Sequence, residues 1–197
     1  MKTPELKQTP FSKVVCSLCK SEFTFPYDGD MNYGELYFKG EQGTAFGFYE
    51  PLSHPLWEYV EKTINDNTTE ELDSDKDHNV GARLQWVIAQ CADPIDNQKL
   101  TPDITCPQCK SFDIYKFELY HDEFVEYRDI PRISFHQFQS LSEKTKVEKI
   151  LNLYCTSLER YPPLHYSRSI LGKTVDFLGY ILFSPVRWFV NLKEKNA

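Results

Sequence analysis

Cys16-Ser-Leu-Cys19-Lys-Ser and Cys106-Pro-Gln-Cys109-Lys-Ser are two closely matched stretches of this 197-residue chain. Two cysteines that are separated by two residues in a tight turn can direct both thiolates at one cation. Two such turns supply four sulfur ligands, which is the tetrahedral set that zinc accepts. The sequence therefore predicts one metal site with four cysteine ligands: Cys16, Cys19, Cys106 and Cys109.

Zinc is the metal expected at this site, and iron, which also accepts four sulfur ligands, is the alternative. A zinc ion with four protein ligands keeps no open position for water or a substrate, so a structural role is expected. A redox role is the other interpretation of a Cys-x-x-Cys pair, but such a pair opens a helix in a βαβ unit. Neither pair here is followed by a helical pattern, so the sequence favours a shared metal.

Each cysteine pair lies between segments that favour β-strands. Val14-Val15 precede the first pair, Ile104-Thr105 precede the second, and aromatic residues alternate with polar ones after both. A strand, a cysteine turn and a second strand, found twice, is the arrangement of a zinc ribbon. The sequence resembles the zinc-ribbon class over about thirty residues around the cysteines, without indicating a specific family.

Two features differ from a compact zinc ribbon. Lys20 and Lys110 follow the second cysteine of each pair, at a place where ribbons often carry glycine. Cys106 lies 87 positions after Cys19, whereas compact ribbons use about 15–20 residues between the pairs. An inserted subdomain over residues 21–105 is therefore predicted.

The other patterns predict an α+β fold with antiparallel strands and three to four helices. Alternating apolar and polar residues predict strands at 11–15, 22–27, 35–39, 44–50, 112–120 and 123–128. The Gly40-Glu-Gln-Gly43 stretch predicts a hairpin turn between the third and fourth of these. Helical periodicity predicts helices beginning near residues 53, 80 and 142.

The expected helices each have one apolar face. Leu56, Val60 and Ile64 recur at helical spacing in the first, and Ser53 is its expected N-cap. The third helix has Ser142 as its expected N-cap, and its apolar positions are Val147, Ile150, Leu151, Tyr154 and Leu158. The two remaining cysteines, Cys91 and Cys155, also lie on apolar faces, so core positions are expected for them rather than ligand roles.

Residues 1–163 are predicted to form one α+β domain containing the zinc ribbon, and residues 164–197 a C-terminal apolar helical segment. Lys173, Asp176 and Arg187 interrupt that segment, so it fits poorly as a membrane span of about 20 apolar residues. Its apolar surface must still be buried. Burial against the protein's own core is expected, and a partner, a second copy of the chain or a membrane interface are the alternatives.

The net charge of −7 is distributed unevenly. Residues 21–80 carry fourteen acidic residues against three lysines, whereas residues 1–20 and 161–197 each carry a net charge of +3. An acidic surface repels a nucleic-acid backbone and attracts a basic protein. The expected function is therefore non-catalytic binding of a basic protein partner, as in a bacterial immunity or antitoxin protein. Nucleic-acid binding through the basic stretches is the alternative.

Neither a secretory signal nor a catalytic motif is visible in the sequence. Residues 1–10 are polar, so a cytoplasmic location with reduced cysteines is expected. The chain has no His-Glu-x-x-His, Gly-x-Ser-x-Gly or phosphate-loop motif, so no catalytic residue is predicted. An enzyme with a structural zinc is the third interpretation. The sequence leaves the partner and the oligomeric state open.

Overall fold

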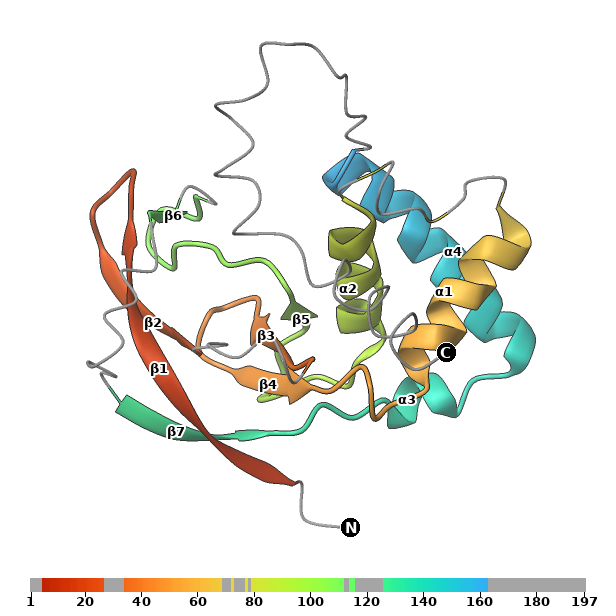
Figure 1. Cartoon of the computed structure of the whole chain (residues 1–197), viewed down its shortest axis with the longest axis horizontal. Coiled ribbons are helices and arrows are strands. Elements are labelled where there is room, and N and C mark those ends of the chain that lie inside the picture. Colours follow the sequence, from red (N-terminus) through yellow and green to blue (C-terminus); the bar gives the residue numbers. More distant parts are fainter. Residues whose placement is uncertain are drawn as a thin grey trace, which may run out of the picture. The chain divides into compact units, whose positions relative to one another are not determined.

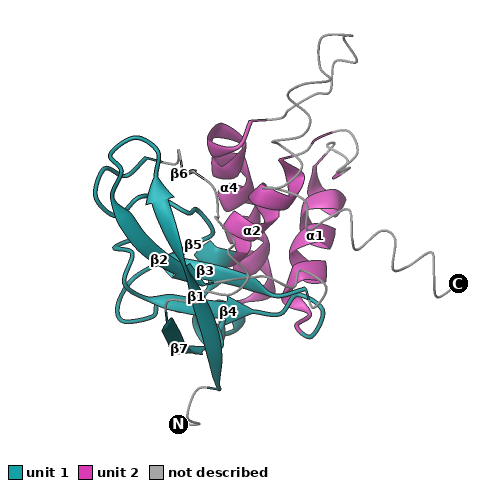
Figure 2. Ribbon diagram, turned by 60° about the vertical axis from the view of Figure 1, so that its left-hand side comes forward, with its two compact units in different colours: residues 1–53, 89–140 teal, residues 54–88, 141–197 magenta. Residues whose placement is uncertain are grey.

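The chain folds into two compact units in the computed structural model, which describes residues 5–26, 34–68, 72, 77, 79–111, 114–115 and 126–162. Unit 1 consists of residues 1–53 and 89–140, and unit 2 of residues 54–88 and 141–197 (Figure 2). The region predicted as an insertion, 21–105, is shared between the units. The predicted C-terminal segment, 164–197, lies outside the described residues.

The described residues form seven strands and four helices, which confirms the predicted α+β class (Figure 1). In the first sheet, the long strand β1 (Leu6–Cys16) pairs antiparallel with β2 (Glu22–Pro26), β6 (Ile114–Tyr115) and β7 (Glu126–Pro131). The C-terminal half of β1 pairs with β2 and its N-terminal half with β7. The last two residues of β1 pair with β6, so both cysteine pairs adjoin the same strand pair.

The second sheet of unit 1 has three antiparallel strands. The predicted hairpin is confirmed: β3 (Leu36–Gly40) pairs with β4 (Phe46–Tyr49) across the expected turn. The two-residue strand β5 (Leu100–Thr101), which has no sequence pattern of its own, pairs with the other edge of β3. The short helix α3 (His136–Gln139) also belongs to this unit, and the carboxylate of Asp93 accepts hydrogen bonds from its first backbone N–H groups.

An aromatic core fills unit 1. Its buried members come from both sheets: Phe11, Val14, Phe25, Phe46, Phe48 and Ile130. The ring of Phe46 meets those of Phe11 and Phe25 edge to face, with centroids 5.2 and 5.8 Å apart, which is a favoured aromatic geometry. The core leaves no room at Gly47, where a Cβ would lie 2.6 Å from Cδ1 of Ile95.

Unit 2 is helical and contains α1 (Leu56–Asn67), α4 (Glu143–Arg160) and most of α2 (Val80–Cys91). The buried residues of α1 include the predicted Leu56, Val60 and Ile64. Its predicted N-cap is wrong, because Ser53 bonds to Glu50 instead and Pro55 occupies the cap position. The ring nitrogen Nδ1 of His54 accepts the N–H of Leu56, which satisfies one free donor of the first turn.

The predicted N-cap of α4 is confirmed, whereas the predicted burial of one residue on its apolar face is wrong. The hydroxyl of Ser142 accepts the N–H of Thr145 over 3.3 Å, as an N-cap should. Cys155, however, is exposed, because it lies beside the narrow buried stripe that Ile150, Tyr154 and Ser157 form. Cys91 is buried, as predicted.

A buried arginine joins the ends of two helices within unit 2. Arg83, only 2% exposed, forms an ion pair with Asp77 and donates to the carbonyl of Tyr161 over 3.0 Å. Its guanidinium also lies 5.8 Å from the ring centroid of Tyr154. The start of α2 is thereby fixed to the end of α4. None of the helices among the described residues is both long enough and apolar enough to cross a membrane.

We expect Asp77→Asn to lower the free energy of unfolding by about 3–5 kcal/mol, because it leaves a buried guanidinium without its anion. Glu148→Gln is the matched control. That carboxylate is 60% exposed in its pair with Lys144, so its loss should cost less than about 1 kcal/mol. Urea unfolding curves of the two variants measure the difference. Equal effects would show that the Arg83 pair is not a stabilising element of unit 2.

Candidate metal centre

The first cysteine turn begins where β1 ends, at Cys16. The backbone N–H of Lys20 donates to the carbonyl of Cys16 over 2.9 Å, and the N–H of Cys16 donates to the carbonyl of Ser21 over 2.9 Å. These two bonds close a tight loop that leaves both cysteine side chains on one side of the strand end. The chain then turns back as β2.

The second turn has the same hydrogen bonds. Lys110 donates its N–H to the carbonyl of Cys106, and Cys106 donates its own to the carbonyl of Ser111, each over 2.9 Å. The N–H of Cys109 also points at the sulfur of Cys106, 3.5 Å away. Amide groups directed at sulfur are typical of cysteine turns that hold a cation, because they stabilise thiolate charge.

The two lysines that replace the usual glycine adopt a glycine-like backbone. Lys20 has a φ of 60° and Lys110 a φ of 61°, in the left-handed region that costs a residue with a Cβ about 1–2 kcal/mol. The same backbone conformation at the same place in both turns indicates a geometric requirement. Because both lysines adopt this backbone conformation, they take the place of glycine without disrupting the motif.

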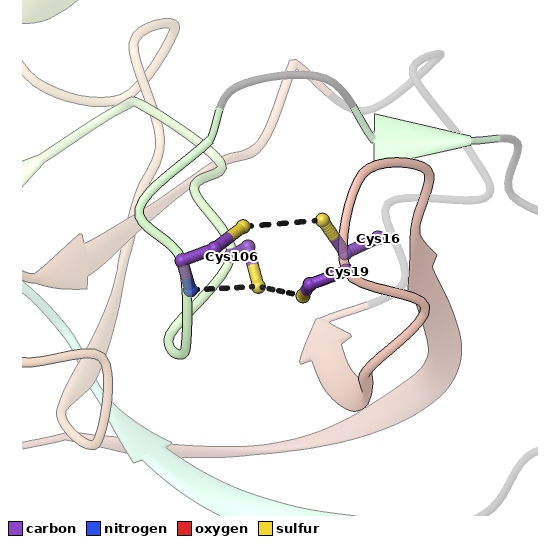
Figure 3. A group of neighbouring side chains, drawn as sticks. Cys16, Cys19 and Cys106 are labelled. Carbon is purple, nitrogen blue, oxygen red and sulfur yellow. Dashed lines mark hydrogen bonds between the residues drawn. The ribbon is translucent and has the colours of Figure 1, made fainter.

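The structure brings all four predicted cysteines together. The sulfur of Cys16 lies 3.5 Å from that of Cys109, and the sulfur of Cys19 lies 3.5 Å from that of Cys106. All four sulfur atoms lie within 4.8 Å of one another. Figure 3 shows the turn of Cys16 and Cys19 facing the turn of Cys106. Cys16 and Cys106 are buried, whereas Cys19 and Cys109 are on the solvent side.

These separations fit a metal site and not disulfides. Sulfur atoms bonded to each other are about 2.05 Å apart, far closer than the 3.5 Å found here. Four sulfurs at about 2.3 Å from a tetrahedral zinc ion would be about 3.8 Å from one another. The observed cluster needs only small shifts to reach that arrangement. Among the described residues this is the one group of metal-ligating side chains close enough to hold an ion.

The pKa shifts of the cysteines are also consistent with a site that binds a cation. Burial raises the pKa of Cys106, but the N–H groups of Cys109 and Gln108 and the hydroxyl of Ser21 outweigh it and lower that pKa to about 6. The N–H of Ser111 lowers the pKa of Cys109, yet burial and the three neighbouring thiols together raise it to about 12. The hydroxyl and the N–H of Ser21 also lower the pKa of Cys19. The cysteines of the cluster therefore differ in how easily they form thiolates.

Two residues other than the cysteines also shape the site. The hydroxyl of Ser21 lies 3.0 Å from the sulfur of Cys19 and 3.1 Å from that of Cys106, so it bridges the two turns. The ammonium group of Lys39 donates to both the carbonyl and the hydroxyl of Thr105, over 2.9 and 2.8 Å, and so positions the chain that enters the second turn. The repeated Cys-Lys-Ser pattern could have indicated Ser21, but no local pattern indicates Lys39.

Comparison of the chain with protein-family models, with curated proteins and with solved structures gives no match. The resemblance to zinc ribbons is therefore supported by the cysteine cluster and its turn geometry. That geometry is consistent with a ribbon-like site formed by two cysteine turns, with no particular family indicated.

We expect Lys20→Gly and Lys110→Gly to leave the free energy of unfolding unchanged or to raise it by up to about 1 kcal/mol. Lys20→Val should lower it by about 1–2 kcal/mol, because a β-branched residue is poorly tolerated at positive φ. The control is Lys13, an exposed residue within β1, where valine should be at least as good as glycine. Denaturant unfolding with zinc present checks the order. The same order at all three positions would contradict the turn geometry.

Proposed function

We propose that the four cysteines bind one zinc ion with a structural role. The observation that supports this most directly is the convergence of four sulfur atoms within 4.8 Å, from two turns with the same backbone hydrogen bonds. Four thiolate ligands form the set that structural zinc prefers. With all four positions occupied by protein, the ion would hold the chain together and would not activate water.

The proposed ion links parts of unit 1 that are far apart in sequence. Cys19 and Cys106 are 87 positions apart, and closing so long a loop costs conformational entropy. The first turn follows the end of β1, and β1 pairs along its length with β2 and β7. A bound ion would therefore fix the central strand of the first sheet to the chain leading into β6.

We predict about one zinc ion per chain and its loss, together with cooperative unfolding, in Cys16→Ser and Cys106→Ser. Each variant removes one of four ligands whose binding energy contributes to folding. Cys155→Ser is the matched control, because Cys155 is exposed and lies outside the cluster. Elemental analysis measures zinc and iron, and the spectrum of the cobalt-substituted protein reports tetrahedral sulfur coordination. Protein that folds without any transition metal would refute the site.

We further propose that the zinc-stabilised chain is a non-catalytic protein that binds a basic protein partner. The support is the charge distribution: residues 21–80 have a net charge of −11, which favours approach of a positively charged surface. Among the described acids of this region, Glu58 and Asp66 are exposed on α1. An immunity or antitoxin protein is one biological setting that suits such a surface.

Nucleic-acid binding is the second candidate, and a specific observation favours it. Lys20 and Lys110 are exposed directly beside the cysteine cluster, where cationic side chains can contact phosphates. The overall charge of −7 opposes it. An enzyme with a structural zinc is the third candidate.

Charge reversal distinguishes these proposals. We expect lysine at Glu70, Glu71, Asp73 and Asp75 together to weaken capture of a basic partner by at least about tenfold. Asp77 is left unchanged because its pairing with buried Arg83 is structural. The control reverses the exposed Glu148 and Glu159 of α4. Pull-downs at low and moderate salt measure capture. Unchanged capture would contradict the acidic surface, whereas steeply salt-dependent RNA or DNA binding would support the second candidate.

A further inference from the structure

A cavity of about 460 Å³ opens beside the cysteine cluster in unit 1. The residues Thr105 and Pro107, on either side of Cys106, form part of its wall. Small-molecule sites in proteins have volumes of about 300–1,000 Å³, so the cavity is large enough for a small ligand. Its polar lining is cationic and hydroxylic, with no carboxylate: Lys39, Arg128, Thr24, Thr44 and Thr105.

Lys39 is unusual because it lies on the core-facing side of its strand. In β3 it shares a face with Tyr37, and its pairing partner in β4 is the buried Phe46. The side chain is only 4% exposed. The hydrogen bonds of Lys39 go to uncharged oxygens of Thr105, while the negative charges of Asp103 and Cys106 attract its ammonium group without a hydrogen bond to it. One N–H of its ammonium has no acceptor among the described residues.

Two hydroxyl groups add further donors to this wall. Thr44 accepts a hydrogen bond from Gln98, and Thr105 accepts one from Lys39. Each hydroxyl therefore keeps its own proton to donate, and neither donates to any described residue. Together with Lys39, these threonines provide three hydrogen-bond donors and one positive charge. An oxyanion supplies the hydrogen-bond acceptors that this set of donors lacks.

Arg128 provides a second cation at the cavity wall. It shares a face of β7 with the core residue Ile130, and its guanidinium lies 4.4 Å from the ring centroid of Phe11. It donates to Thr24 over 2.9 Å and pairs with Glu126. The guanidinium is thus held in place, and Glu126 neutralises part of its charge. The remaining wall is apolar and includes Phe23, Phe46 and Pro107.

We propose that this cavity binds a small organic oxyanion, a phosphate or carboxylate that carries an apolar group. The oxyanion contacts Lys39, Thr44 and Thr105, and Arg128 completes the charge. The apolar group lies against Phe23 and Pro107. The proposal goes beyond the protein-binding role above and rests on the cysteine turns being held in place, since Thr105 and Pro107 flank Cys106.

Phenyl phosphate, inorganic phosphate and phenol are the probes, and titration calorimetry of the full zinc-loaded chain is the measurement. We expect phenyl phosphate to bind with a Kd of about 0.1–1 mM, inorganic phosphate to bind more weakly, and phenol not to bind. Lys39→Met and Arg128→Gln should each weaken phenyl phosphate by at least about tenfold, the loss expected for one charged hydrogen bond. Lys13→Met, an exposed lysine outside the cavity, should leave binding unchanged.

Glu126→Gln separates a ligand site from a purely structural ion pair. This change removes the carboxylate that competes for Arg128, so phenyl phosphate should bind about two- to tenfold more tightly. Zinc content is measured in every variant, so loss of the metal centre is distinguished from loss of the oxyanion site. If Lys39→Met also loses zinc, Arg128→Gln and Glu126→Gln decide the result.

Three results would overturn the proposal. The first is that phenyl phosphate at millimolar concentration does not bind to protein that holds one zinc ion. This result would refute the oxyanion site and leave the proposed metal site standing. The second is binding that Arg128→Gln and Glu126→Gln do not change. The third is tight, salt-dependent binding of a short single-stranded oligonucleotide without binding of phenyl phosphate, because this would assign the cations to a nucleic-acid surface.

Discussion

Repulsion among four thiolates held close together is the constraint on which the metal centre of unit 1 depends. Sulfur atoms 3.5 Å apart cannot all carry negative charge unless a cation lies between them. Burial raises the pKa of Cys106, but nearby N–H and hydroxyl donors lower it to about 6, whereas the N–H of Ser111 lowers the pKa of Cys109 but burial and the neighbouring thiols raise it to about 12. A bound dication would remove the repulsion, and the turns already have the hydrogen bonds that a metal site needs. The strand β1, which ends in the first turn, would then be fixed at that end.

The hydrophobic core of unit 1 lies next to the cysteine cluster and contains residues from both sheets. Phe11 and Val14 on β1 pack with Phe46 and Phe48 on β4, so the strand that carries Cys16 also carries part of the aromatic core. Lys39 lies on the same face of the second sheet as Phe46 and Phe48, at the end near the cysteines. An ammonium group in that position has a desolvation cost that its bonds to Thr105 only partly offset. Such a cost is common where a protein binds a charged group.

Unit 2 is stabilised in a different way. Its helices bury narrow apolar stripes, and the buried Arg83 joins the start of α2 to the end of α4 through Asp77 and the Tyr161 carbonyl. Such a network specifies one arrangement of helix ends, because each partner is left unsatisfied if the other moves. Asp77 belongs to the acidic stretch that the sequence assigns to partner binding, but its surroundings give it a structural role.

The sequence by itself determined the local features. The Cys-x-x-Cys turns, the β3–β4 hairpin, the helix beginning at Ser142 and the burial of Cys91 all follow from residues close together in the chain, where turn geometry, capping and periodicity act. The sequence also predicted that the two turns share a metal site, and the tertiary structure brings them together. Only the tertiary structure decided that Lys39 faces a core and a cavity and that Cys155 is exposed. These outcomes depend on contacts between residues far apart in sequence. The strength of such contacts is set by the packing of many side chains, and no local pattern encodes it.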